Sequence, residues 1–528
     1  MQRRFLGAID QGTSSTRFIL FEASTLRPFG SYQRVLTVSS PHPAWSELDP
    51  IEILDSVYEC MIETLKTSSV SVDEIASIGI TNQRESTIAW DATTGKPLYN
   101  AILWNDARTS SICQHLSSQQ LDLGDGGEQR APGAHQLADL CGLPISTYFS
   151  APKISWMLSN VPAIREAVDH GRCLFGTVDS WLIWNMTGGV NGGAHVTDPS
   201  NASRTMLMNL HTLKWDDCLC SVFSVDPKTL PRICSSDDRF GTIVNPAPFA
   251  GVPITGCLGD QQAALVGQKC FKPGQSKNTY GTGTFLLAHA GSTPPAASKG
   301  LLRTVGYVLK GQKCYAVEGS VAVAGSGIRW LRDNLGVIAS AEESETLAAS
   351  VPDTGNVFFV PAFAGLFAPY WRSDARGTIV GLTQFSTKAH IVRAMLESVC
   401  LQTREVVDSM KSDCGIELES MNVDGGMTSN KTFLQMQADV LGIPVIRPEY
   451  AETTALGAAI AAGLGCGVYN SLDDVLNIGS DEVSVYKPVW TAAQRARHMK
   501  KWKAAVERSF NWFTDAPEED DEEVDALA

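Results

Sequence analysis

The start of the chain constrains the fold more than any other segment. The apolar run Phe5–Ile9 ends at Asp10, and a second apolar run, Arg17–Phe21, follows after a few glycine and hydroxyl residues. Because so short a connection leaves no room for a helix, the pattern predicts an antiparallel hairpin. A strand-to-helix phosphate loop is therefore not expected at this position.

Apolar runs typical of strands recur along the chain and alternate with longer helical patterns, which predicts an α/β fold. Asp49 and Pro50 are residue types that favour the start of a helix, and apolar residues follow at helical spacing from Ile51 to Leu65. Further strands are predicted at Ile75–Ile80, Val252–Leu258 and Met421–Val423.

A chain of 528 residues is too long for a single hydrophobic core, so at least two domains are predicted. We expect an N-terminal domain over residues 1–268, a C-terminal domain over 269–513 and an acidic, disordered tail over 514–528. The run Glu518–Glu523 keeps that tail solvated, because like charges repel one another. The glycine-rich, polar segment Asp122–Gln136 is predicted to be a surface loop.

Charge and cysteine usage exclude several classes of protein. A formal net charge of -15 argues against binding to nucleic acid or anionic membranes, since both repel an acidic protein. No apolar run approaches the ~18 residues that span a bilayer, and no signal peptide is visible. The 13 cysteines include no Cys-x-x-Cys pair, so neither a zinc site nor a redox pair is indicated. We expect a cytoplasmic protein; docking on mitochondria is left open.

Two segments about half a chain apart resemble each other. Ala8–Gly12 and Leu258–Gln262 both place an Asp-Gln pair at the end of an apolar strand, with the aspartates at Asp10 and Asp260. Repetition at this spacing suggests two related α/β halves that face one another. Turns with aspartate after a strand are common, so this similarity alone is thin evidence for a duplication.

The first turn has the chemistry that phosphoryl transfer requires. Groups that can bind phosphates, namely backbone N–H groups, hydroxyls and one cation, come from Gly12, Thr13, Ser14, Ser15 and Arg17. Asp10, at the end of the strand, is placed to reach Mg²⁺, which keeps several waters and takes only one or two carboxylates. A polar β-turn without a ligand is an equally good interpretation of this segment taken alone.

Any ATP site in this chain must use an uncommon scaffold. The chain contains neither a Walker A pattern nor the glycine-rich loop of protein kinases. Gly281–Gly283 and Asp424–Gly426 form further tight turns after apolar runs, and glycine there lets the backbone approach a ligand closely. Three such turns spread over both halves are a more specific signal than any one of them.

The turn after the strand Ile75–Ile80 places Arg84 next to Glu85. Such a pair suits a polyol, because arginine donates hydrogen bonds to hydroxyl groups and glutamate accepts them. Trp104 and Tyr148 are candidates for the apolar walls of a small pocket. On general grounds, a surface ion pair and ordinary core aromatics are the commoner interpretations of these residues.

Several longer motifs resemble the FGGY family of carbohydrate kinases. Tyr148–Trp156 is similar to one family motif, and Gly377–Leu382, continuing through His390 to Glu397, is similar to the second. Gly189–Gly193 resembles animal members of the family in particular. Shorter similar segments are Asn82–Glu85, Ser146–Ser150, Gly259–Leu265 and Asn278–Gly283. The resemblance extends from about Gly7 to about Gly467, which is nearly the whole chain.

The resemblance implies an α/β fold of two duplicated actin-like (ribonuclease H-like) domains with a central cleft. It also implies ATP and Mg²⁺, and direct phosphoryl transfer to glycerol to give sn-glycerol 3-phosphate for glycerolipid and central carbon metabolism. By the same resemblance, Asp260 is the general base on the substrate hydroxyl and Asp10 holds the metal. The implied glycerol-binding residues are Arg84, Glu85, Trp104, Tyr148, Asp260, Gln261 and Phe285.

The nucleotide-binding residues that the resemblance implies come from both halves of the chain. They are Gly12, Thr13, Ser14, Ser15, Arg17, Thr282, Gly325, Arg329, Gly426 and Asn430. Arg329 departs from the family pattern, because many bacterial relatives carry glutamine there.

Two alternatives stand beside phosphorylation of glycerol. Another sugar or polyol kinase of the same family, acting on a pentulose or on gluconate, would share the fold, but the aromatic Trp104 and Phe285 favour the small triol. An actin-like ATPase that serves as a scaffold would need no polyol pocket. Whether the chain forms a homodimer is left open by the sequence.

Overall fold

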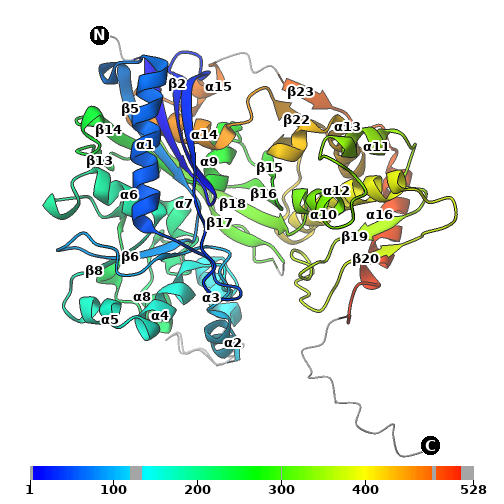
Figure 1. The fold of residues 1–528 in the computed structure, drawn as a ribbon, viewed down its shortest axis with the longest axis horizontal. Coiled ribbons are helices and arrows are strands. Elements are labelled where there is room, and N and C mark those ends of the chain that lie inside the picture. The colour runs from blue at the N-terminus through cyan, green and yellow to red at the C-terminus, as the bar shows by residue number, and fades with distance from the viewer. Residues whose placement is uncertain (1–3, 119–133, 299, 479–482, 513–528) are drawn as a thin grey trace, which may run out of the picture.

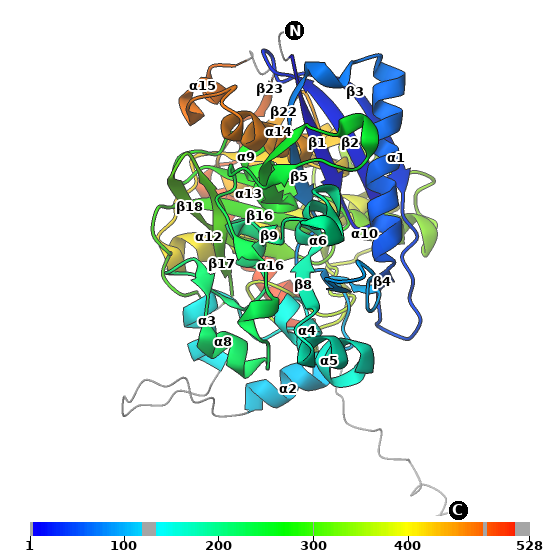
Figure 2. The same cartoon turned by 90° about the vertical axis from the view of Figure 1, so that its left-hand side faces the viewer.

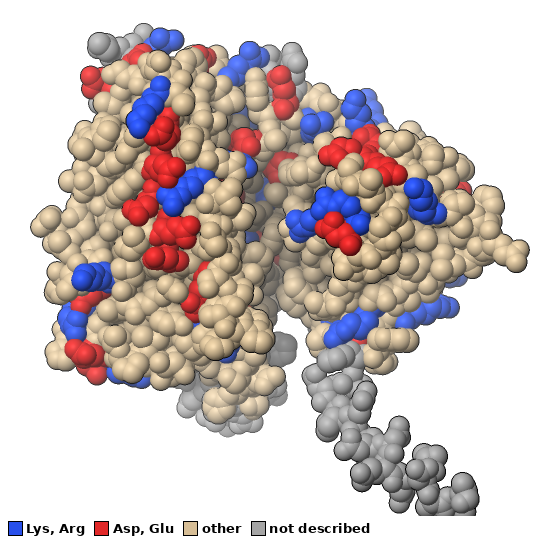
Figure 3. Space-filling view, in the orientation of Figure 1, with Lys and Arg blue, Asp and Glu red and all other residues tan. Residues whose placement is uncertain are grey.

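The computed structural model describes residues 4–118, 134–298, 300–478 and 483–512. They form two lobes, each built on a large β-sheet (Figure 1), and the surface is hollowed between the lobes (Figure 3). The predicted tail, residues 514–528, and most of the predicted loop Asp122–Gln136 lie outside the described residues. The end of that loop prediction was wrong, because helix α3 (Ala134–Cys141) already begins there.

The N-terminal lobe is built on a six-stranded sheet in the order β13-β14-β5-β1-β2-β3. Its strands are β1 (Phe5–Gln11), β2 (Ser15–Glu22), β3 (Pro28–Val35), β5 (Ile75–Asn82), β13 (Gly241–Thr242) and β14 (Pro253–Gly259). Strands β1 and β2 pair antiparallel, with Gln11 opposite Thr16, whereas β1, β5 and β14 run parallel. The predicted hairpin at the start of the chain is thereby confirmed.

Helices cover both faces of this sheet. They are α1 (Pro50–Ser68) and α6 (Val178–Met186) on one face, and α9 (Asp260–Gly267) and α14 (Thr453–Gly465) on the other. Because side chains alternate along a strand, Phe5 and Ile9 pack with α1 and α6 while Leu6 and Ala8 pack with α9 and α14. Figure 2 shows α1 lying along the hairpin strands.

Helix α1 begins where its sequence predicts. Asp49 is its N-cap residue, and the side-chain oxygen Oδ1 accepts a hydrogen bond of 2.8 Å from the backbone N–H of Ile51. Pro50 occupies the first helical position, where its missing N–H costs nothing. This prediction is confirmed.

The C-terminal lobe is built on a seven-stranded sheet in the order β17-β18-β16-β15-β21-β22-β23. Its strands are β15 (Ser276–Tyr280), β16 (Thr284–Gly291), β17 (Leu302–Leu309), β18 (Gln312–Val321), β21 (Met421–Asp424), β22 (Val445–Pro448) and β23 (Val483–Tyr486). The antiparallel hairpin β15–β16 and the parallel strands β15, β21 and β22 repeat the arrangement of β1–β2 and of β1, β5 and β14. The two sheets are therefore related by duplication.

Asp10 and Asp260, the two aspartates that suggested the duplication, do not occupy equivalent positions in the two sheets. Asp10 lies near the end of β1 and Asp260 follows β14, and both strands belong to the N-terminal sheet with only β5 between them. The counterpart of β1 is β15, whose turn at Gly281–Gly283 corresponds to the first turn of the chain. The interpretation of Asp10 and Asp260 as a repeat was wrong, because they end two parallel strands at one edge of a single sheet.

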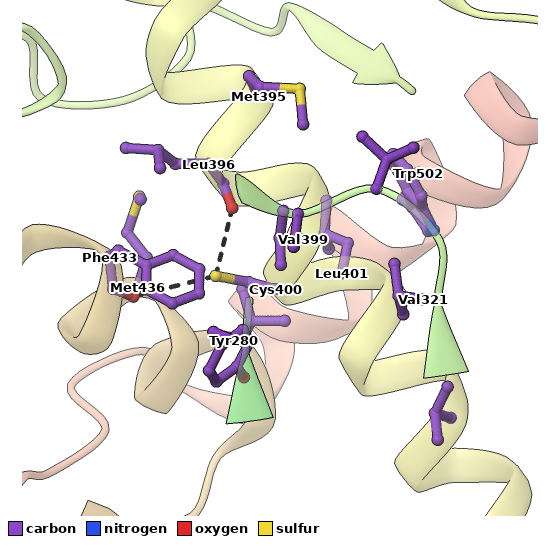
Figure 4. Packing of buried hydrophobic residues seen from close by; sticks show 14 of the residues in the cluster. Tyr280, Val321, Met395, Leu396, Val399, Cys400, Leu401, Phe433, Met436 and Trp502 are labelled. Carbon is purple, nitrogen blue, oxygen red and sulfur yellow. Dashed lines mark hydrogen bonds between the residues drawn. The ribbon is translucent and has the colours of Figure 1, made fainter. Parts of the chain in front are cut away.

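The core of the C-terminal lobe forms between its sheet and a set of long helices. These are α10 (Gly325–Asp333), α12 (Lys388–Cys414), α13 (Lys431–Leu441) and α16 (Ala492–Glu507). Figure 4 shows Cys400 on α12, whose thiol donates to the carbonyl of Leu396 at 3.5 Å, beside the edge-to-face pair of Tyr280 and Phe433. Trp502 of α16 is completely buried in the same core.

Helices α9 and α14 lie between the two sheets and belong to a core that both sheets share. They touch through their backbones, because a Cβ atom on Gly457 would lie 1.8 Å from the carbonyl oxygen of Ala263, and one on Gly267 would lie 1.9 Å from that of Thr453. Although α14 comes late in the sequence, it packs on β14, β5 and β1. The predicted boundary at residues 268 and 269 stays a prediction.

The remaining elements of the N-terminal lobe form a small mixed region below its main sheet (Figure 1). They include β4 (Glu47–Leu48), β6 (Thr87–Asp91), β7 (Ala101–Ile102), β8 (Cys173–Thr177), α2 (Ser110–Ser118), α4 (Ser150–Asn160), α5 (Pro162–Asp169), α7 (Pro199–Ala202) and α8 (Asp217–Val222). The C-terminal lobe also contains α11 (Glu343–Ala349), α15 (Leu472–Leu476), β19 (Phe358–Val360) and β20 (Thr378–Val380). No helix within the described residues is both long and apolar enough to cross a membrane.

Candidate active site

Three parallel strands of the N-terminal sheet bring polar residues to one edge. Strands β1, β5 and β14 end close to Asp10, Arg84 and Asp260, and the backbone N–H of Gln83 donates to the carbonyl of Gln11 at 2.8 Å. In α/β sheets, ligands bind in the crevice outside the carboxyl ends of the strands. The sheet order thus places the predicted metal, substrate and base residues at the position where such folds bind ligands.

Arg84 and Glu85 are buried, so the interpretation as a surface ion pair is wrong. Their residues are 3% and 1% exposed, and Nε of Arg84 lies 3.2 Å from Oδ1 of Asp260. Glu85 has a φ of 61°, which is rare for a residue with a side chain. Strain of this kind persists where the surroundings hold a side chain in place for a ligand.

Two further charged residues, Glu318 and Arg204, complete this site. Nη1 and Nη2 of Arg84 lie 2.5 and 3.0 Å from the two carboxylate oxygens of Glu318. Arg204 donates to Oε1 of Glu85 at 2.6 Å and to Oε1 of Glu318 at 3.2 Å. Burial would raise the pKa of Glu318, but Arg204 and Arg84 outweigh burial and hold that pKa at about 2.

Neither Glu318 nor Arg204 was predicted from the sequence. A usable signal was present for Glu318, which is a single acid inside the apolar strand segment Cys314–Val321. A charged residue in such a buried strand needs a partner of opposite charge. No comparable signal marks Arg204, which follows the short helix α7 in a polar stretch.

Aromatic rings from both lobes stand next to these charges. The ring of Trp104 lies edge-on to Tyr148 and to Phe285, with centroid distances of 5.6 and 6.2 Å. The hydroxyl oxygen of Tyr148 lies 3.5 Å from Nη2 of Arg84. Phe285 comes from β16 of the C-terminal lobe, so the predicted pocket walls are brought together across the boundary between the lobes.

The position of Tyr148 is fixed by a buried lysine that the sequence analysis did not single out. Nζ of Lys153 donates to the backbone carbonyls of Thr147, Tyr148 and Phe149 at 2.9, 2.6 and 3.0 Å. Burial lowers the pKa of Lys153 to about 7. Three carbonyl partners close the turn that presents the Tyr148 ring.

The first turn lies beside the aromatic rings. The backbone N–H of Gly12 donates to the carbonyl of Ser15 at 2.9 Å, and the indole N–H of Trp104 donates to Oγ1 of Thr13 at 2.9 Å. Arg17 points to the start of α14, where its guanidinium lies 2.5 Å from the carboxylate of Glu452. The structure therefore joins Thr13 to the polyol residues and pairs Arg17 with an acid.

Asp10 has the properties of a metal-binding carboxylate. Burial raises its pKa to about 7, partly offset by Arg17 and reinforced by Asp260 and Glu452. Within the described ranges, no hydrogen-bond donor is directed at its side chain. A hard oxygen ligand without a competing donor, next to a phosphate-type turn, fits Mg²⁺.

Gln261 is held by a second buried lysine that was not predicted. Nζ of Lys277, on β15, donates to Oε1 of Gln261 and to Oγ1 of Thr279, the latter at 3.0 Å. Burial lowers the pKa of Lys277 to about 8, although Asp424 pulls in the opposite direction. Since Gln261 belongs to the N-terminal lobe, this contact also crosses between the lobes.

The predicted nucleotide residues of the C-terminal lobe lie around the turn after β15. The N–H of Gly325 donates to the carbonyl of Gly281 at 3.0 Å, and Nη2 of Arg329 donates to Oγ1 of Thr282 at 3.1 Å. A Cβ atom on Gly325 would lie 2.6 Å from the carbonyl oxygen of Gly281, so only glycine fits there. These residues form one tight corner where α10 begins.

Gly426 and Asn430 lie at the adjacent end of β21. Apart from Gly426 and its two chain neighbours, no heavy atom of the described residues lies within 4 Å of the position that a Cβ of Gly426 would take, which leaves open space in front of the backbone. Asn430 caps α13, since its Oδ1 accepts from the N–H of Phe433 at 2.8 Å, and its Nδ2 lies 3.5 Å from Oγ of Ser344. The side chain of Asn430 thus has a structural role beside the predicted one.

Comparison with known families finds two family models that match successive parts of the chain. The model of the FGGY family of carbohydrate kinases, N-terminal domain, matches residues 5–267, and the model of the C-terminal domain of the same family matches residues 276–466.

Among individual proteins, the chain is 48% identical to glycerol kinase 2 of Streptomyces avermitilis, over 97% of this chain and 98% of that protein. It is 49% identical to the glycerol kinase of a Roseiflexus species, over 96% and 99% of the two chains. The crystal structure of Plasmodium falciparum glycerol kinase with ADP superposes with a TM-score of 0.88 at 39% identity, covering 96% of this chain and 98% of that one. A gluconate kinase from Lactobacillus acidophilus, 20% identical with a TM-score of 0.82, shares the fold.

Proposed function

The chain belongs to the FGGY family of carbohydrate kinases, and from this premise we propose that it transfers the γ-phosphoryl group of ATP to glycerol. The products are ADP and sn-glycerol 3-phosphate. The observation that supports this proposal best is the buried group of Arg84, Glu85 and Asp260, walled by aromatic rings and joined through Trp104 to the turn at Thr13. Relatives named glycerol kinase at 48–49% identity support the same substrate.

The polyol pocket suits a small triol. Arg84 can donate to a substrate oxygen and Glu85 can accept from a hydroxyl, while Trp104 and Phe285 pack against the carbon skeleton. Gln261, whose Oε1 is held by Lys277, would use its amide N–H groups as further donors to the substrate. Because the aromatic walls come from both lobes, a longer sugar has little room in this arrangement.

Asp260 is proposed as the general base. It lies at the start of α9, and Arg84 at 3.2 Å keeps its carboxylate oriented toward the pocket. As the glycerol oxygen attacks the γ-phosphorus, the new O–P bond forms, the bond from phosphorus to the β–γ bridging oxygen breaks, and the hydroxyl proton passes to Asp260. Phosphoryl transfer needs little else than alignment and charge stabilisation.

The nucleotide is proposed to lie across both lobes. Its phosphates would be bound by the first turn, from Gly12 to Ser15, and by the turn at Thr282, with the remainder toward Gly325, Arg329, Gly426 and Asn430. Asp10 would hold Mg²⁺, which neutralises charge on the phosphates when bound. Arg17 would act indirectly, because its guanidinium is already paired with Glu452.

An ADP-release assay with a panel of polyols tests the proposal. We expect turnover with glycerol to exceed turnover with xylitol, sorbitol, xylulose and gluconate by at least about a hundredfold in kcat/KM, which is the discrimination that a fitted polar pocket provides. Preferred turnover of a pentulose or of gluconate would assign another member of the family.

A binding measurement separates the enzyme from an actin-like ATPase scaffold. We expect millimolar glycerol to raise the melting temperature without nucleotide, whereas sorbitol and xylitol at the same concentration leave it unchanged. A scaffold would hydrolyse ATP at a rate that glycerol does not change, and glycerol would not be phosphorylated. The cytoplasmic location and the oligomeric state stay predictions.

A further inference from the structure

The polyol site rests on four buried charges that form a closed ring. Arg84 contacts Glu318, Glu318 contacts Arg204, Arg204 contacts Glu85, and Glu85 lies 3.8 Å from Arg84. We call these four residues the charge ring. Each side chain is no more than 2% exposed. Two positive and two negative charges balance, which is the condition for holding charges away from water.

We propose that Glu318 and Arg204 are positioning residues that fix Arg84 and Glu85 for glycerol and thereby set the affinity for the polyol. The inference rests on the proposed function. Glu318 and Arg204 act through their partners. They are assigned no role in the chemical step.

The contacts of the ring decide which atoms remain for the substrate. Glu318 occupies both terminal nitrogens of Arg84, so the guanidinium plane is fixed with Nε toward Asp260. Arg204 occupies Oε1 of Glu85, and no described residue donates to Oε2, which remains as an acceptor. A bidentate pair fixes orientation as well as charge, and such pairs are stronger than neutral hydrogen bonds.

Arg204 is also tied to the aromatic side of the pocket. Its guanidinium carbon lies 5.4 Å from the ring centroids of Tyr148 and Phe149, within the range of cation–π attraction. Its Nη1 is buried and has no hydrogen-bond partner within the described part of the chain. A residue needed only for stability would not be expected to leave a buried donor unpaired beside a substrate pocket.

The ring joins the two lobes. Arg84, Glu85 and Arg204 belong to the N-terminal lobe, whereas Glu318 lies on β18 of the C-terminal sheet, directly opposite Leu287 of β16. Two residues earlier on β16 stands Phe285, an aromatic wall of the pocket. One pair of strands therefore supplies both a wall of the pocket and the anchor of Arg84.

The test must keep the ring neutral, because a buried charge without its partner destabilises a protein severely. Glu318→Asp keeps the charge but withdraws the carboxylate from Arg84. The double variant Glu318→Gln with Arg204→Gln removes one charge of each sign. Glu47→Asp is the matched control, since Glu47 is a buried glutamate paired with Arg108 at 2.8 Å outside the site.

Steady-state kinetics and glycerol titration calorimetry are measured for all four proteins. We expect Glu318→Asp and the double variant to raise KM and Kd for glycerol by about 10- to 100-fold, which is the range for hydrogen bonds to charged groups. The KM for ATP should stay within about twofold of the wild-type value and kcat within about fivefold, because the variants lose binding energy that the ground state and the transition state share. Glu47→Asp should leave the glycerol KM unchanged even if it lowers the melting temperature.

The outcomes separate the inference from the function. If the wild type phosphorylates glycerol and either folded variant keeps the glycerol KM within about twofold, the positioning roles are wrong while the function stands. Equal loss of affinity for glycerol and ATP also overturns the inference, since it indicates general distortion. If the wild type neither binds nor phosphorylates glycerol, the proposed function fails and the inference fails with it. Should Glu318→Asp not fold, the charge-balanced double variant carries the test alone.

Discussion

At the scale of single residues, the chemistry depends on how buried charges are paired. Glu318 stays ionised with a pKa of about 2 because two guanidinium groups face it, whereas burial alone would favour its neutral form. Among the described residues, Lys153 and Lys277 have no carboxylate partner within hydrogen-bond distance, and burial lowers their pKa values to about 7 and about 8. A buried group therefore keeps its charge where an opposite charge faces it, and is shifted toward its neutral form where none does.

We predict that Asp260→Asn lowers kcat by about 10²–10⁴ while changing the glycerol KM only a few-fold. Asparagine keeps the size and one acceptor oxygen but cannot take the hydroxyl proton in the transition state. Steady-state kinetics at saturating ATP and Mg²⁺ measure this. A kcat within about tenfold of the wild type would refute the base assignment. Partial rescue by Mn²⁺ would indicate a role in metal binding instead.

At the scale of elements, the helices α9 and α14 cross with almost no side chain between them. Glycine at positions 267 and 457 lets the two backbones touch, and α14 carries alanines over much of its length. Small residues at a helix crossing permit the shortest approach, and any added atom meets backbone that cannot move aside.

We predict that Gly457→Ala destabilises the protein by about 1–3 kcal/mol or more, because the new Cβ would overlap the carbonyl of Ala263. In a helix without this contact, the same change would stabilise by about 1 kcal/mol, so the sign of the measured change is decisive. Urea unfolding followed by circular dichroism gives the free energy. Thr454→Ala on the same helix adds no atom and is the control; a stabilised Gly457→Ala variant would show that the helices are not in contact.

Helices α12 and α16 are joined by the buried Glu397 and the half-buried His498, whose carboxylate and ring nitrogen are in contact. Burial raises the pKa of Glu397 to about 8, although Arg393 acts to lower it. Burial lowers the pKa of His498 to about 4, and Lys501 acts in the same direction. Asp353 also faces both groups. The folded pair therefore keeps a proton on the carboxyl group at neutral pH.

We predict that the contribution of Glu397 to the free energy of unfolding falls as the pH rises from about 6.5 to about 8. Above about 6.5 the unfolded chain has lost the protons of both groups, whereas the folded chain keeps that of Glu397 until about 8. Through Glu397 the folded state then binds more protons, so this contribution decreases with pH, by up to about 1.4 kcal/mol per unit. Below about 6.5 the titration of His498 in the unfolded chain opposes this trend.

Glu397→Gln removes the titrating proton and should make the slope of the free energy of unfolding against pH more positive than in the wild type between pH 6.5 and 8, measured by urea titration in a series of buffers. Glu419→Gln, at an exposed position, should leave the slope of the wild type. Identical slopes for the wild type and Glu397→Gln would show that the carboxyl group is ionised in the folded protein.

The helices and strands that were predicted correctly are those that depend on residues close together in the sequence. The hairpin β1–β2 and the start of α1 at Asp49 depend on neighbours within a few residues, which a sequence displays directly. Arg84 and Glu318 are 234 residues apart, and no local pattern links them. Asp10 was predicted from its place in the first turn, and the role of Asp260 from the resemblance. Their relation was misread, because the order of strands in a sheet does not follow from their order in the chain.

At the scale of the whole molecule, the lobes are not independent. The core around α9 and α14 takes side chains from both sheets. Arg17 pairs with Glu452, and Lys277 contacts Gln261 across the same boundary. Cutting the chain at the predicted boundary would expose the face of β1, β5 and β14 that α14 covers.

We predict that the fragments 1–268 and 269–528, expressed separately, each bind ADP at least about a hundredfold more weakly than the intact chain, because each has only one of the two phosphate turns. Fluorescence titration with a labelled ADP measures the affinity, and circular dichroism reports whether each fragment is folded. A folded fragment that binds ADP as well as the whole chain would contradict a nucleotide site that spans both lobes.

Because the aromatic pocket is divided between the lobes, its assembly affects how easily water can react with ATP. Phe285 stands on one lobe and Trp104 on the other, so any motion that parts the lobes also takes the pocket apart. Under the proposed function, glycerol would contact both rings only when the lobes are together, and a ligand favours the arrangement for which it has the higher affinity. By the same proposal, without glycerol the γ-phosphoryl group would have no aligned acceptor beside Asp260. We therefore expect the hydrolysis of ATP by solvent to be slow until the polyol itself closes the molecule around the nucleotide.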